Sequence, residues 1–234
     1  MTEPASVTVA DTVHWLHDEG LIRLTGVAWP TVETILAYTV EIATGTITAY
    51  PAVGSATGSE PLTVEADDLP HPAGTPKRLV VVGSTMSDAM LVLDLAAVTA
   101  LALNADRPET TARAWVMQLL LNPEITLTTN SAELAVPAGP RCRYTFIPGG
   151  GTLFTVDDRQ PPVTTISLNP VIEGPDHLDI AADGTAELYL GTRCWPLRRV
   201  LGVEDQVWSA LTAELETAAA QLDSTPAEGA GAHL

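Results

Sequence analysis

The chain has 234 residues, of which 46% are hydrophobic, so it can bury a substantial core and is not generally disordered. Its 29 acidic and 11 basic side chains give a net charge of −18, which repels nucleic-acid backbones and anionic membranes. No apolar run approaches the length of a spanning helix, and the first residues contain neither a basic region nor an apolar signal core. We therefore expect a cytoplasmic protein, or one assembled in a phage particle, without nucleic-acid binding or membrane insertion.

The first 70 residues predict a small α+β portion. Residues 9–16 are expected to form a short helix or strand that ends at Gly20, and residues 21–25 alternate like a strand. In 31–40 the apolar residues have helical spacing, which favours a helix, although the content of Thr and Val also permits a strand. Two further short strands are expected, at 46–50 and 62–69, on either side of a flexible loop.

Two histidines in this portion are the candidate metal ligands. His14 and His17 are three residues apart, so on a helix they would share one face and could hold zinc, with Asp18 and Glu19 beside them. No motif supplies an obvious third ligand. The pattern therefore favours a solvated helix end, and we expect neither a metal nor another cofactor.

Prolines mark the clearest domain boundary. Residues 71–76 read as a linker between the N-terminal portion, 1–70, and a main α/β domain at 77–222, and a disordered tail is expected over 223–234. The predicted fold class is α/β or α+β, a mixed β-sheet flanked by a few helices.

The main domain is organised around residues 79–121. Residues 79–82 form a continuous apolar run, which suits a strand buried on both faces, and two further short runs follow at 91–95 and 100–103. Asp106 is expected to cap a helix, with Glu109 at the spacing of a capping box, until Asn122 and Pro123 end it. A strand, a loop and a helix N-terminus together form a natural anion site.

The segment VVVGS…MLVLDLAAVTALALNADRPETTARAWVMQLLL resembles the start of an ATPase domain of the FtsK-type translocase and type VII secretion class. It is more similar still to degenerate, lysine-free versions of that segment in large actinobacterial regulators. There a later stretch recurs that is similar to residues 177–180, 183–184, 186–191 and 196–199, followed by an acidic helix. The resemblance covers roughly residues 79–220 and implies an ATPase-like scaffold.

The loop at 104–111 departs from a phosphate-binding loop, which needs glycines, a lysine and a Ser or Thr. Only Thr111 fits, while Asp106 and Glu109 place negative charge where a phosphate would lie. No nucleotide-binding residue is therefore carried over. Arg107 and Thr111 are the candidate polar contacts if this loop binds a ligand, and its acidic residues suit a cation or a sugar.

Downstream, strands are expected around two turns and a hairpin. The triple glycine at 149–151 favours a hairpin turn over a phosphate cradle, and Asp157 with Asp158 favours an exposed turn over a cation site.

Cys142 and Cys194 are expected to be small buried hydrophobes. The expected strands are 132–136, 141–147, 153–156, 164–168, 177–180 and 186–190, and a helix at 203–222 carries an apolar stripe of Val207, Leu211, Leu215 and Leu222.

No motif of nucleophilic, metallo- or dinucleotide chemistry is present, so we assign no catalytic residue and favour a protein that is not an enzyme. The favoured function is a non-catalytic interaction or assembly protein, an accessory or structural subunit of an actinobacterial or phage complex. Its partner would be another protein or a further copy of this chain. The alternative is a small-molecule-binding or enzymatic α/β domain with its site near the N-terminus of the helix that starts at Asp106.

Overall fold

The computed structural model describes residues 7–27, 34–52, 60–71, 78–136, 139–146, 151–172 and 174–224. Residues 72–76 of the expected linker, the glycines at 149 and 150, and nearly all of the expected tail lie outside the described residues. The helices are α1 (Val9–Trp15), a π-helical turn (Leu16–Gly20), α2 (Leu21–Thr25), α3 (Pro108–Leu120) and α4 (Asp205–Ser224). The strands are β1 (Ile35–Glu41), β2 (Ile47–Pro51), β3 (Leu62–Val64), β4 (Leu79–Thr85), β5 (Ala89–Asp94), β6 (Ala100–Asn104), β7 (Thr126–Thr129), β8 (Cys142–Tyr144), β9 (Thr152–Asp157), β10 (Thr164–Leu168), β11 (His177–Ile180), β12 (Ala186–Leu190) and β13 (Arg193–Val200).

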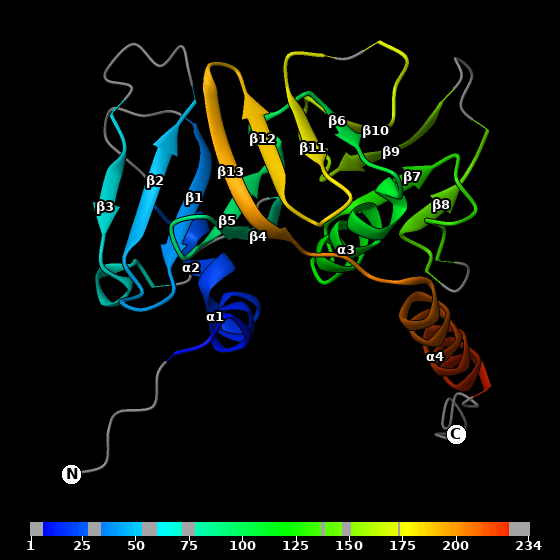
Figure 1. Cartoon of the computed structure of the whole chain (residues 1–234). Coiled ribbons are helices and arrows are strands. Elements are labelled where there is room, and N and C mark those ends of the chain that lie inside the picture. The colour runs from blue at the N-terminus through cyan, green and yellow to red at the C-terminus, as the bar shows by residue number, and fades with distance from the viewer. Residues whose placement is uncertain are drawn as a thin grey trace, which may run out of the picture.

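Within the described residues, thirteen strands form one mixed sheet in the order β3-β2-β1-β5-β4-β13-β12-β11-β6-β10-β9-β7-β8 (Figure 1). The fold is mixed α/β, as the sequence predicts. The antiparallel hairpin β4–β5 is extended by β1 on one side and by β13 on the other. β6 lies between β10 and β11 and is parallel to both.

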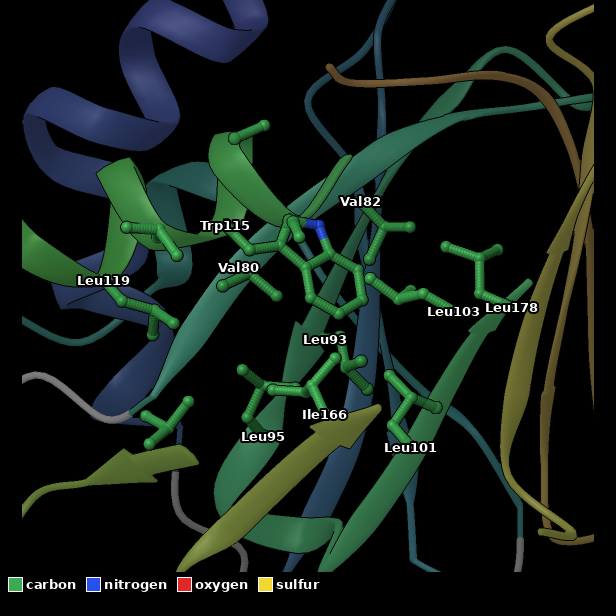
Figure 2. Close-up of a cluster of buried hydrophobic side chains, with 14 of the residues drawn as sticks. Val80, Val82, Leu93, Leu95, Leu101, Leu103, Trp115, Leu119, Ile166 and Leu178 are labelled. Carbon is green, nitrogen blue, oxygen red and sulfur yellow. The ribbon is translucent and has the colours of Figure 1, made fainter. Parts of the chain in front are cut away.

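Apolar side chains cover both faces of β4 and β5. Because successive residues of a strand point to opposite faces, Val80 and Val82 belong to a core under α3, while Val81 belongs to a second core under α1 and α2. Trp115 of α3 is fully buried in the first core, among Val80, Val82, Leu93 and Leu103 (Figure 2). The continuous apolar run at 79–82 is thus a strand buried on both faces, as predicted.

The sheet also curves over on itself. The rings of Tyr50 on β2 and Trp195 on β13 lie 5.5 Å apart at 86°, although three strands separate β2 from β13 in the sheet order. The Arg193 guanidinium lies 5.6 Å from the Tyr50 ring. The inner face of β12 and β13 therefore contributes to the same core as α3.

The N-terminal segment differs from the prediction in two places. Residues 21–25, predicted as a strand, form α2, and Gly20 does not end the helix but closes its π-helical turn. Over 31–40 the sequence favours a helix and also permits a strand, and the structure has the strand: residues 35–41 form β1, whose side chains Leu36 and Tyr38 are buried in the two different cores. The β-branched residues of this segment fit the strand that β5 requires as its neighbour.

Two further predictions are wrong. The predicted strand at 132–136 is a turn at 132–134. Asp106 does not cap α3: the helix begins at Pro108, the N-cap position is Arg107, and no side chain caps it. Arg107 instead binds the Glu109 carboxylate at 3.2 Å, which removes the predicted capping box.

Candidate functional site

A groove of about 710 Å³ lies where β6 ends and the loop to α3 begins. β6 and β11 are parallel, so their carboxyl ends meet at one edge, where open α/β sheets commonly bind ligands. The groove is lined by Met86, Asn104, Ala105, Asp106, Asp179, Ile180, Ala181, Thr185, Ala186, Glu187, Pro196 and Leu197.

Sheet register brings the polar residues of this groove together. Asn104 of β6 lies opposite Asp179 of β11, and its amide donates a hydrogen bond of 2.8 Å to the Asp179 carboxylate. Asp179 in turn lies opposite Glu187 of β12. With Asp106 from the loop, three carboxylates therefore line a groove whose lining residues include no basic side chain.

A ring pair lies on the neighbouring row of β11 and β12. His177 stacks on Tyr189 with ring centroids 4.7 Å apart, and its Nε2 lies 3.7 Å from the Asp179 carboxylate. The Tyr189 hydroxyl donates a hydrogen bond to Glu187, which raises the pKa of Tyr189. Asp179, which accepts from Asn104, and Glu187, which accepts from Tyr189, therefore each have a hydrogen-bond partner and also line the groove.

This groove can accept positive charge or hydroxyl groups. Its oxygens suit an amine, a guanidinium or a sugar, because a carboxylate accepts hydrogen bonds and donates none. Among the described residues no group of three or more His, Cys, Asp and Glu side chains is arranged to hold a metal ion.

Arg107 and Thr111, the sequence-predicted contacts, do not line the groove. The Arg107 guanidinium binds Glu204 at 3.2 Å and Asp205 at 2.8 Å, and so connects the start of α3 to the start of α4. Thr111 is buried, with 3% of its surface exposed. Their role as ligand contacts stays a prediction.

The first turn of α4 is fixed to the body by several contacts. Arg113 donates to the Asp205 carboxylate at 2.5 Å and to the Glu133 carbonyl at 3.1 Å. The buried Trp208 ring lies 5.7 Å from the Arg113 guanidinium.

Apart from this anchor, α4 is open to solvent. Val207, in the first turn, is 52% exposed and Leu215 is 39% exposed, while Leu211 is half-buried and no residue of 209–217 is buried. Figure 1 shows the later turns of α4 pointing away from the sheet. The side of α4 that carries Val207, Leu211 and Leu215 is called the α4 stripe below.

The other predicted candidates lie apart from the groove. His14 is exposed with its Nε2 3.1 Å from the Asp18 carboxylate, while His17 is half-buried in the π-helical turn. Cys142 is buried, but Cys194, predicted to be buried, is exposed on β13, and both are free thiols.

Sequence reasoning missed Asn104, Asp179 and Glu187. The hairpin signal of Asp183 and Gly184 could have placed Asp179 and Glu187 on one outward face. The pairing of β11 with β6 has no local signal, so Asn104 could not have been added to them.

Comparison with family models, curated proteins and solved structures finds no match to this chain. None of the helices in the described ranges combines the length and hydropathy that a bilayer crossing requires.

Proposed function

We propose that this chain is a non-catalytic interaction protein whose α4 stripe docks in an apolar, basic-rimmed surface of a partner protein. The observation that carries the proposal is the exposure of Val207 and Leu215, at 52% and 39%, on a helix in which Trp208 is the one buried residue among 205–217.

The physical argument starts from helix stability. A helix without tertiary packing is marginal in water, so most of its stability has to come from burying an apolar face. Val207, Leu211 and Leu215 are four residues apart and lie on one side of α4. Full burial of each contributes about 1.5–3 kcal/mol, which is enough in sum to support a transient complex.

The negative charge of α4 indicates which kind of protein it can bind. No lysine or arginine occurs between Asp205 and Ser224, and Glu214 and Glu216 are exposed on α4. Glu214 lies seven residues after Val207, beside the stripe, so two copies of the stripe would bring their Glu214 carboxylates together, in molecules that each carry a net charge of −18. A basic rim on a different protein is the complementary surface.

The same proposal includes the kind of complex in which the chain works. An ATPase-like scaffold without its phosphate loop, working in the cytoplasm or in a phage particle, would serve as an accessory or structural subunit of an actinobacterial or phage complex. The resemblance over residues 79–220 and the acidic residues at 106 and 109 support this context.

The test is affinity capture from native cells with quantitative mass spectrometry. We compare the wild type with the double variant Val207→Glu and Leu215→Glu, and use Ser209→Glu, at an exposed position on the opposite side of α4, as the control. The expected partner is retained by the control, lost by the double variant, and released by salt. A complex that the double variant retains, or a dimer that it abolishes in light scattering, would contradict this docking mode.

The groove beside Asp106 favours a second candidate function, the binding of a small amine. Titration with 1,4-diaminobutane, against 1,4-butanediol of equal length, tests it by calorimetry. Asp179→Asn should weaken diamine binding, whereas Asp88→Asn, which changes an exposed carboxylate outside the groove, should not. Equal binding of diamine and diol would eliminate the amine site.

A further inference from the structure

A second pocket, of about 210 Å³, lies between the π-helical turn and the C-terminal end of α3. It shares no lining residue with the acidic groove. Leu79, Leu119 and Ile125 are buried lining residues, while Leu121 also lines the pocket but is 69% exposed. The pocket is therefore apolar within and open to solvent beside Leu121.

The π-helical turn gives this pocket its remaining wall. His17 and Ile22 are five residues apart and both line the pocket. In an α-helix these side chains would diverge by about 140°, whereas residues five apart share a face in a turn with i to i+5 hydrogen bonds. Such turns often occur at functional sites.

The sequence accommodates this turn at Gly20. Trp15 and Gly20 are also five residues apart, and a Cβ atom on Gly20 would lie 2.8 Å from the Trp15 ring. A larger residue would displace the ring, so the glycine permits the geometry that directs His17 toward the pocket.

His17 is the polar side chain that a ligand can reach. Gln118 is occupied, since its amide accepts from the Val81 N–H at 2.7 Å and donates to the Val81 carbonyl at 3.1 Å. Asn122 accepts from the Glu124 N–H at 3.0 Å. Within the described ranges the His17 imidazole has no hydrogen-bond partner.

The pocket suits an uncharged ligand. Desolvation lowers the pKa of His17, against the opposing effect of Asp18, so its imidazole is neutral at neutral pH and offers one donor and one acceptor. Apart from His17, the pocket is lined by uncharged residues, so an ionised ligand would lose hydration without gaining an opposite charge.

We propose that this pocket binds a small uncharged molecule, with one ring and one hydroxyl or N–H group, that hydrogen-bonds to His17. The volume fits this class, because an apolar cavity of about 150 Å³ in another protein holds benzene. This inference is independent of the proposed interaction function.

The test is a titration of the full chain with phenol and toluene, followed by NMR of the ligand and of backbone amides. We expect saturable binding of both, with shifts at residues 17–22 and 118–125. His17→Phe should weaken phenol binding about fivefold, the equivalent of one hydrogen bond, and leave toluene unchanged. His14→Phe, at an exposed position of the neighbouring α1, is the control and should change neither.

A second variant does not depend on the imidazole. Leu121→Trp adds a ring at an exposed position of the lining and should reduce the binding of both compounds without unfolding the chain. Benzoate and benzylamine should not compete. The proposal is wrong if neither compound binds at millimolar concentration, if His17→Phe binds phenol as tightly as the wild type, or if the charged analogues bind equally well.

Discussion

Gly83, the glycine that ends the apolar run of β4, has a packing role. A Cβ atom at this position would lie 2.1 Å from the Arg199 carbonyl oxygen, because β4 and β13 approach closely there. We predict that Gly83→Ala lowers the free energy of unfolding by about 3 kcal/mol or more, since the two strands have to separate.

Urea unfolding checks this prediction. Gly174→Ala is the matched control, because nothing lies within 4 Å of its added Cβ, and we expect a change within about 0.5 kcal/mol. Equal stability of both variants would refute the close approach of β4 and β13.

Arg78 is a buried cation at the start of β4, with 1% of its surface exposed. It donates to the Asp158 carboxylate at 2.5 Å, to the Gln160 carbonyl at 2.5 Å and to the Pro162 carbonyl at 2.7 Å. Asp158→Asn should destabilise the fold by about 2 kcal/mol at pH 7, because it leaves the buried guanidinium without its counter-charge. The exposed pair of Arg198 and Asp88 provides the control, and Asp88→Asn should cost less than about 1 kcal/mol.

The same pair predicts a pH dependence. Burial is the largest single influence and would raise the pKa of Asp158, but the hydrogen bonds from Arg78 and from the Gln160 N–H, with the positive charge of Arg78, together hold the pKa below its ordinary value. A carboxyl group whose pKa is depressed on folding stabilises the fold above its unfolded pKa of about 3.9, and this contribution is lost as pH falls through the folded pKa. The difference in unfolding free energy between the wild type and Asp158→Asn should therefore shrink as pH falls below about 4. A constant difference in denaturant melts down to pH 3 would contradict the assignment.

At the scale of elements, α4 depends on very few side chains. Trp208→Ala removes the buried ring at its first turn, so we predict that amide exchange over 205–217 becomes about tenfold faster while the strands of the sheet change little. Mass spectrometry of hydrogen exchange measures this directly. Val207→Ala, at the exposed neighbouring position, should leave the exchange unchanged, and similar rates in both variants would mean that α4 is anchored elsewhere.

Elements with a clear local pattern were predictable from the sequence. The run at 79–82 and the hairpin turn at Asp183 and Gly184 carry their periodicity or turn chemistry within a few residues, and both predictions are confirmed. Residues 21–25 and 35–41 have ambiguous patterns, and their conformation is decided by what they pack against, α2 on the second core and β1 on β5. Intrinsic helix and strand propensities could therefore not predict the conformation of these two segments.

The candidate groove was predictable only in part, for the same reason. Its neighbourhood near Asp106 was expected from the order of strand, loop and helix. Asn104 and Asp179 meet through pairing between strands 75 residues apart, and no local pattern reports such a pairing. The free side of α4 was likewise hidden, because an apolar stripe has the same spacing whether a core or a partner covers it.

At the scale of the whole molecule, the sheet joins the N-terminal portion to the rest. β1 pairs with β5 along five residues, and the second core combines Leu16 and Tyr38 with Val81 and Met90. We predict one cooperative thermal transition, with calorimetric and van't Hoff enthalpies that agree. Two resolved transitions would instead mean that residues 1–70 fold as a separate unit.

The position of β6 has a consequence for synthesis on the ribosome. Ala100 pairs with Thr165 and Ala102 with His177, so both neighbours of β6 come from later parts of the chain. An apolar strand, with Leu101 and Leu103 buried in the finished fold, therefore emerges from the exit tunnel before either neighbour exists. Until residue 180 has been translated, the nascent chain has to keep this segment from misassembly, by slow elongation or by a chaperone that covers it.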